Sequence, residues 1–165
     1  MSLRLARQKD LPEIVRIYNA SIPAGKATAD TLPVTVEQRL DWFASHQSPE
    51  RPLWVWEDEQ RLGGWVSLGD FYGRPAYRNT CEVSIYLDPA CQGQGLGKKL
   101  LQHALEAARE VGITRLVGYI FAHNEASLRL FEAEGFESWG YLPEVAEING
   151  RVISLCILGK KLDQG

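Results

Sequence analysis

A glycine-rich segment between a strand pattern and a long helix pattern constrains the fold more than any other feature. Gln92-Gly93-Gln94-Gly95-Leu96-Gly97 separates residues 80–87, which alternate strictly in polarity, from residues 96–111, whose apolar side chains recur at helical spacing. Glycines let a ligand approach the backbone closely, and a helix start offers unpaired N–H groups with partial positive charge. The segment therefore predicts a strand, a phosphate-binding turn and a helix, in that order.

Three phosphate-binding motifs compete for this segment. A P-loop needs four residues between its first glycine and its Gly-Lys pair, followed by Ser or Thr. Here only three residues separate Gly93 from Gly97, and Lys99 stands in the position of the Ser or Thr. A dinucleotide loop needs G-x-G-x-x-G, and the glycines here fall one residue short of it. The pattern that fits is Q/R-x-x-G-x-G/A, through Gln92, Gly95 and Gly97. A glycine turn that only caps a helix stays open as an alternative.

The rest of the chain predicts a mixed α/β fold. Strand patterns cover residues 3–7, 53–57, 62–68, 116–121, 136–142 and 151–159, and a helix covers 125–134. Two capping boxes, Asp10 to Glu13 and Thr35 to Gln38, open helices near the N-terminus. The order predicts antiparallel hairpins first and a strand-helix-strand unit later.

Composition excludes several classes of protein. With 165 residues, 45% of them hydrophobic and 24% charged, the chain is expected to form a single domain, residues 1–165. A net charge of −3 gives no overall field for nucleic acid. Neither the three cysteines nor the three histidines have metal-ligand spacing, and no apolar run has the length of a signal peptide or membrane span. We therefore expect a cytoplasmic protein with reduced thiols, no metal and no membrane or nucleic-acid partner.

The order of the motifs carries a resemblance to a known family. The glycine loop follows the strand Glu82 to Leu87, and further on come Asn124-Glu125-Ala126-Ser127 and Gly135-Phe136. Together these pieces resemble the GNAT superfamily of N-acetyltransferases. Within it, residues 3–160 resemble the phosphinothricin and methionine-sulfone acetyltransferase group through four further segments: Ile17-Tyr18-Asn19, residues 39–43, Gly64-Trp65-Val66-Ser67 and residues 76–82.

The resemblance implies acetyl-CoA as co-substrate and a mostly antiparallel central sheet, flanked by helices, with one splayed parallel strand pair. The pantetheine arm would lie in the gap of that pair and bind strand backbone as an added strand. The pyrophosphate would bind the amides of the glycine loop, with Lys98 and Lys99 either near a phosphate or simply solvated. The implied co-substrate contacts are Ile85, Tyr86, Leu87, Gln92, Gly93, Gln94, Gly95, Leu96, Gly97, Lys98, Asn124 and Ser127.

Direct attack of an amine on the thioester needs a base, an oxyanion donor and a proton for the thiolate. The resemblance suggests Glu82 as the base, although a solvated glutamate on a strand face is the alternative. The Leu87 N–H is the expected oxyanion donor. Phe131 stands where many members have Tyr and this group often has His, so the acid is open: Tyr86, a water, or no acid at all.

The acceptor is less defined. Arg74 and Arg78 are expected to bind a carboxylate, with Tyr77 as a wall, unless this loop is merely solvated. The group often carries Lys-His-Gly or Lys-Phe-Gly followed by Trp and Asp near the acceptor, whereas this chain has Ile148-Asn149-Gly150-Arg151-Val152-Ile153-Ser154. The resemblance therefore leaves the identity of the amine open.

Three functions follow, in order of preference. The first is an acetyl-CoA-dependent N-acetyltransferase that works in a ternary complex on a small amine, such as an amino acid, phosphinothricin, or methionine sulfone or sulfoximine. The second is an acyl-CoA sensor without turnover, which Phe131 and the altered C-terminal segment motivate. The third is an acetyltransferase for protein N-termini or lysines. The resemblance also suggests a homodimer.

Overall fold

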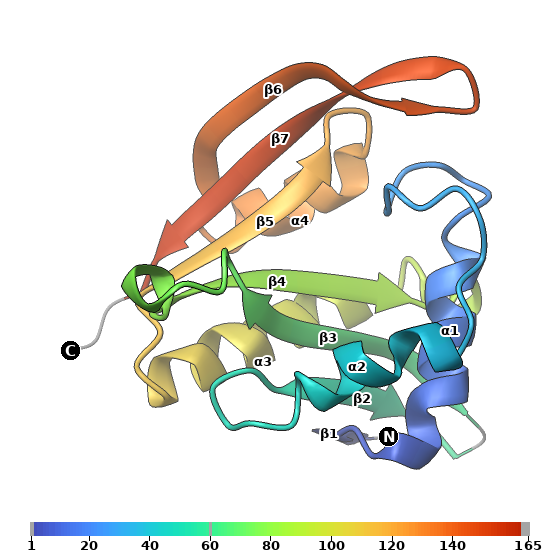
Figure 1. Cartoon of the computed structure of the whole chain (residues 1–165), viewed down its shortest axis with the longest axis vertical. Coiled ribbons are helices and arrows are strands. Elements are labelled where there is room, and N and C mark those ends of the chain that lie inside the picture. Colours follow the sequence, from blue (N-terminus) through green and yellow to red (C-terminus); the bar gives the residue numbers. More distant parts are fainter. Residues whose placement is uncertain (1, 60, 163–165) are drawn as a thin grey trace.

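The computed structural model describes residues 2–59 and 61–162 and shows a seven-stranded mixed sheet with helices on both faces (Figure 1). The strands follow the order β1-β2-β3-β4-β5-β7-β6, and only β4 and β5 among these neighbours are parallel. The strands are β1 (Ser2–Leu5), β2 (Leu53–Glu57), β3 (Leu62–Asp70), β4 (Thr80–Leu87), β5 (Arg115–Phe121), β6 (Glu137–Ile148) and β7 (Arg151–Lys161). The helices are α1 (Leu11–Ala20), α2 (Leu40–Ala44), α3 (Leu96–Glu110) and α4 (Glu125–Ala133). The predicted mixed α/β class is confirmed.

The parallel pair comes apart after a short stretch. Pairing between β4 and β5 runs only from Thr80 opposite Arg115 to Glu82 opposite Val117, whereas β5 stays paired with β7 along its whole length. Beyond Glu82 the two strands diverge toward their carboxyl ends (Figure 1). The predicted splayed pair is confirmed, and its gap opens where β4 runs on into the glycine loop.

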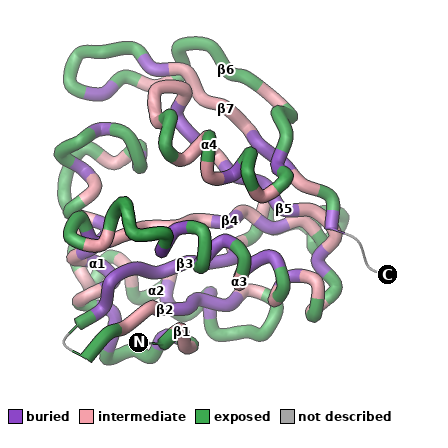
Figure 2. The backbone as a smooth tube through the Cα atoms, turned by 180° about the vertical axis from the view of Figure 1, so that it is seen from behind, coloured by how far each residue is buried: buried purple, intermediate pink, exposed green. Residues whose placement is uncertain are grey.

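Alternation along β4 separates two cores. Cys81 and Val83 pack against the apolar stripe of α3, while Tyr86 packs with α1 and α2 on the opposite face. Figure 2 shows β3 almost entirely buried between these layers, whereas β6 at the sheet edge is largely exposed. No helix in the described part of the chain is long and apolar enough to cross a membrane.

The two predicted capping boxes have different outcomes. Thr35 and Gln38 exchange the expected side chain–backbone bonds, at 2.9 and 3.1 Å, just before α2. The box predicted at Asp10 is wrong. The Asp10 carboxylate instead accepts from the Arg7 N–H at 2.7 Å, in the turn before α1, and from the Arg4 guanidinium on β1 at 2.8 Å, so it makes no cap bond to the amides of α1.

The C-terminal hairpin is longer than predicted. β6 continues to Ile148 instead of stopping at residue 142, across an irregularity that contains Pro143 and the positive-φ residue Glu144. Asn149 and Gly150 then form the turn, with φ of 53° and 77°, the combination that a two-residue hairpin turn requires. The segment from Ile148 onward therefore forms the tip of a hairpin.

Candidate active site

The start of α3 is built as an open anion site. Gly93 and Gly95 have φ of 77° and 79°, and a Cβ at either position would meet no atom within 4 Å. Gly95 is the N-cap of α3 and supplies no side-chain cap, so the amides of the first turn are left for a ligand. Asp88 fixes the preceding turn, since its buried carboxylate accepts from the Ala90 N–H at 2.8 Å and pairs with Arg16 at 2.9 Å. These features fit a diphosphate.

Three elements converge at Gly97. A Cβ there would lie 3.2 Å from a methyl of Leu130 on α4 and 3.8 Å from a methyl of Leu87 at the end of β4. Both lysines are exposed, but the Lys99 ammonium lies 5.2 Å from the centre of the Trp56 ring and is thus directed toward β2. Lys98 is therefore the better placed of the two lysines for a ligand phosphate.

Two further loop residues have different positions. The Gln94 amide donates to the Ala90 carbonyl at 3.2 Å and so supports the turn, while Gln92 is exposed beside the glycines.

The sheet register determines which backbone groups of β4 face the gap. The Asp88 N–H donates to the Gly63 carbonyl at 2.9 Å, and hydrogen-bonded pairs alternate along an antiparallel ladder. The main chain of Tyr86 is thereby directed to Trp65 on β3, and the main-chain groups of Ile85 and Leu87 are directed toward β5, where pairing has ended. Of the three residues expected to pair with a bound arm, Ile85 and Leu87 have the required orientation.

Tyr86 uses its side chain on the other face. Its ring stacks on Trp65 with centroids 4.8 Å apart, and its hydroxyl donates to the Ala27 carbonyl at 3.0 Å. Burial raises the pKa of Tyr86, and the nearby Tyr18 raises it further. The Tyr86 hydroxyl is therefore hydrogen-bonded to the loop between α1 and α2.

That loop bridges the open end of the gap. His123 Nε2 donates to the Gly25 carbonyl at 3.0 Å, and the Asn124 side-chain amide donates to the Lys26 carbonyl at 3.3 Å. The Asn124 side-chain oxygen also accepts from the Ser127 N–H at 3.3 Å, so Asn124 caps α4 and fastens the loop at once. The sequence indicated only a polar loop here, because its partners lie about a hundred residues away.

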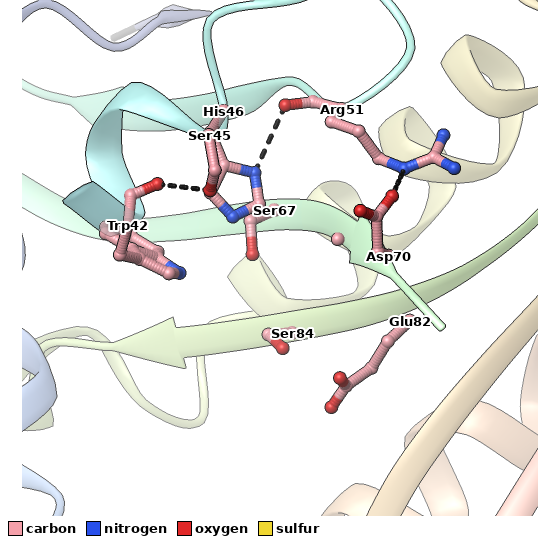
Figure 3. Close-up of a pocket in the computed structure, with 9 residues that line it drawn as sticks. Trp42, Ser45, His46, Arg51, Ser67, Asp70, Glu82 and Ser84 are labelled. Carbon is pink, nitrogen blue, oxygen red and sulfur yellow. Dashed lines mark hydrogen bonds and ion pairs between the residues drawn. The ribbon is translucent and has the colours of Figure 1, made fainter. Parts of the chain in front are cut away.

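Glu82 lies where β4 and β5 part. Its backbone is opposite Gly69 on β3 and Val117 on β5, the last parallel pair. Burial of the side chain raises the pKa of Glu82. Its side chain borders a cavity of about 260 Å³ between α2 and the sheet (Figure 3). The cavity is lined by Trp42, Ser45, His46, Arg51, Ser67, Gly69, Asp70, Glu82 and Ser84.

The cavity wall contains polar groups that sequence reasoning missed. Arg51 Nε donates to the Asp70 carboxylate at 2.5 Å, and the Arg51 carbonyl lies 3.1 Å from Nδ1 of the buried His46 (Figure 3). Burial lowers the pKa of His46, which favours a neutral ring. One feature of the sequence does indicate a polar cavity here. Ser84 and Glu82 lie on the same face of β4, and a strand face packed only against apolar helices would not carry two polar side chains.

The residues predicted to bind the acceptor carboxylate lie on the loop between β3 and β4. Arg74 and Arg78 are exposed, and Tyr77 packs against Phe71 and Tyr72 with centroids 5.6 and 5.5 Å apart. None of the predicted three lines the cavity.

Phe131 lies on the other face of the sheet. Its ring is buried under β5, where a Cβ on Gly118 would come within 2.8 Å of it, and Phe136 packs beside it at 4.9 Å.

An open helix start, a strand edge that faces a splayed gap and a half-buried carboxylate at the head of that gap fit acyl transfer from a donor that bears a diphosphate and an extended arm. The model of the acetyltransferase (GNAT) family matches residues 12–136, and the chain belongs to this family. The acetyltransferase activity expected from the sequence is confirmed at this level.

Similar proteins agree with the assignment. The chain is 51% identical over 163 residues to the Bacillus subtilis protein YwnH, whose name assigns it provisionally to the phosphinothricin acetyltransferases, covering 98% of this chain and 99% of that one. It is 34% identical over 164 residues to the L-methionine sulfoximine/L-methionine sulfone acetyltransferase of Salmonella typhimurium, covering 99% of this chain and 96% of that one. A phosphinothricin acetyltransferase from Sinorhizobium meliloti, solved in complex with acetyl-CoA, superimposes with a TM-score of 0.94 at 30% identity, covering 99% of this chain and 89% of that one.

Proposed function

We propose that the chain, as one catalytic domain, transfers the acetyl group of acetyl-CoA to the primary amine of a small amino-acid-like acceptor within a ternary complex. One observation carries the proposal: Glu82 stands at the point where the β4–β5 gap opens, and its side chain also borders a polar cavity. A carboxylate in this position reaches both a thioester held in the gap and an amine held beside the cavity.

The donor side rests on the backbone. The open amides at the start of α3 hold the pyrophosphate, and the main-chain groups of Ile85 and Leu87 bind the pantetheine arm. The Leu87 N–H lies nearest the end of β4 and stabilises the oxyanion that forms when the amine adds to the thioester. Asn124 and Ser127 lie at the start of α4, beside the same gap.

Glu82 supplies the base. An ammonium has no lone pair, so the acceptor must lose a proton before it attacks. An ordinary carboxylate is too acidic to take this proton efficiently, and burial raises the pKa of Glu82 toward the range where proton transfer becomes easier. The half-buried position therefore makes Glu82 a better base than a solvated glutamate.

The acceptor side favours a small polar amino acid. A cavity of about 260 Å³ has room for one such molecule, and its hydroxyl, imidazole and guanidinium groups suit a polar side chain. The names of the relatives, which cite phosphinothricin and methionine sulfoximine, point to acceptors of this kind. Arg74, Tyr77 and Arg78 lie on the β3–β4 loop outside the cavity lining, and the two exposed guanidinium groups are our proposed partners for the acceptor carboxylate, with Tyr77 beside them.

Thiol release from acetyl-CoA, measured with a panel of amino acids and their analogues, tests the proposal. Glu82→Gln should lower kcat about 100-fold or more, while the Kd for acetyl-CoA stays within about twofold. Full activity in this variant would refute the assigned base. Acetyl-CoA binding without turnover on any amine would favour the sensor, and faster reaction with peptides than with free amino acids would favour a protein acetyltransferase.

We also propose that the protein is a cytoplasmic homodimer. β6 forms one edge of the sheet and exposes Trp139, Tyr141 and Val145, which are 39%, 58% and 57% accessible. A long apolar edge strand is a site where a second chain pairs. Light scattering over a range of concentrations tests this, and a monomer throughout would refute it.

A further inference from the structure

Tyr119 lies on β5 in a position that the sequence did not single out. Glu82 is opposite Val117 in the parallel pair, so the side chains of these two residues share one face of the sheet. Side chains alternate along a strand, and Tyr119, two residues after Val117, therefore extends on the face that carries Glu82. Gly118 between them faces the opposite side, where the Phe131 ring covers it.

The gap between β4 and β5 gives the side chain of Tyr119 access to a group bound between the two strands. Because β4 and β5 are unpaired beyond Glu82 and Val117, a group held between them is accessible from both faces of the sheet. Phe131 approaches from the α4 face and carries no hydroxyl. Tyr119 brings a hydroxyl from the face of Glu82.

The surroundings of Tyr119 leave its hydroxyl available as a donor. The side chain is half-buried, and its hydroxyl makes no hydrogen bond to the residues that the structure describes. On β7 its neighbour is the apolar Ile157. Burial raises the pKa of Tyr119, and the charges of Glu82 on β4 and Tyr72 on the β3–β4 loop raise it further. The phenol is therefore protonated at neutral pH.

We propose that Tyr119 donates a proton to the leaving thiolate, acting across the splayed gap from Glu82. Phe131 cannot take this role because it has no hydroxyl. This inference rests on the proposed function, because it presumes a thioester in the gap.

The step balances as follows. Glu82 takes one proton from the acceptor ammonium, the amine nitrogen forms a bond to the acetyl carbon, and the carbon–sulfur bond breaks. The thiolate takes the hydroxyl proton of Tyr119. The protonated Glu82 then returns a proton to the phenolate, and the second proton of the amine leaves to solvent when the amide forms. The products are the N-acetyl amine, the free thiol and one released proton, with both side chains restored.

Tyr119→Phe removes the hydroxyl and keeps the ring. Steady-state kinetics on the acceptor that wild type acetylates best should show kcat reduced about 10- to 100-fold, with the KM for the amine and the Kd for acetyl-CoA within about twofold. The alkaline limb of the kcat–pH profile should also disappear. Tyr72→Phe, the same substitution on the exposed neighbouring loop, serves as the matched control and should keep wild-type kcat.

Two results would overturn the inference. One is a kcat in Tyr119→Phe equal to that of Tyr72→Phe. The other is a raised KM with unchanged kcat, which would make Tyr119 an acceptor-binding residue. Failure of the proposed function looks different, since wild type itself would then release no thiol with any amine.

Discussion

Replacing Gly95 by alanine tests the anion site at the start of α3 directly. Gly95 has φ of 79°, a conformation that costs an L residue roughly 1–2 kcal/mol. A Cβ there meets no protein atom within 4 Å, so this backbone strain is the main expected cost to the fold. For a chain of 165 residues, about 1 kcal/mol corresponds to a decrease in Tm of about 3 °C.

The effect on binding should be much larger than the effect on stability. The open space beside Gly95 is where the proposed diphosphate approaches the first-turn amides, and a methyl group would hold it away from them. Loss of one hydrogen bond to a charged group costs about 1.5–3 kcal/mol, which is about a 10- to 150-fold increase in Kd. Calorimetric titration with acetyl-CoA measures this change, and a thermal melt measures the stability.

Gly112 offers a matched control at the other end of the same helix. It has φ of 84°, and a Cβ there also meets no atom within 4 Å. Gly112→Ala should therefore lower Tm by a similar amount and leave the affinity for acetyl-CoA unchanged. If the two variants bind acetyl-CoA equally well, the reasoning about the glycine loop is refuted.

Two further predictions concern carboxylates. Burial raises the pKa of Glu82, so the ionised side chain opposes folding. Glu82→Gln should therefore raise Tm at pH 7, and the increase should shrink as the pH falls toward 4 and the wild-type carboxylate becomes protonated. An unchanged Tm at pH 7 would count against burial of Glu82. Burial opposes ionisation of Asp88, but the Ala90 N–H and Arg16 outweigh it and lower its pKa. Asp88→Asn should cost about 3 kcal/mol at pH 7, and the loss should shrink as pH falls below about 4, where wild type loses the same stabilisation. Urea unfolding at several pH values measures both, and a pH-independent loss in Asp88→Asn would contradict the second prediction.

Local patterns were enough to predict most of the fold. Strict alternation placed residues 80–87 in a strand, and the apolar stripe after Gly95 placed α3, because each pattern reports one buried face. The first capping box failed for a reason outside its own segment: Asp10 binds Arg4, which the β1–β2 pairing brings alongside the start of α1. Pro143 ended the predicted strand early, although an edge strand tolerates proline at an irregularity.

Within the candidate site, the sequence likewise predicts one part well and another part poorly. The donor side is contiguous in sequence, since the end of β4, the glycine loop and the start of α3 follow one another, so one motif was enough to predict it. The acceptor side is assembled from α2, the segment around Arg51, β3 and β4, and no single segment records that these come together.

Tyr119 shows that the register between β4 and β5 is the information that the sequence does not supply. Its role depends on which face of β5 it occupies relative to Glu82, and that face is fixed by a parallel register three residue pairs long. A slip of one residue in that register would direct Tyr119 toward α4 and Gly118 toward the gap. The sequence contains both residues without specifying the register, so a missing acid at Phe131 and an available hydroxyl at Tyr119 could be connected only once the strands were aligned.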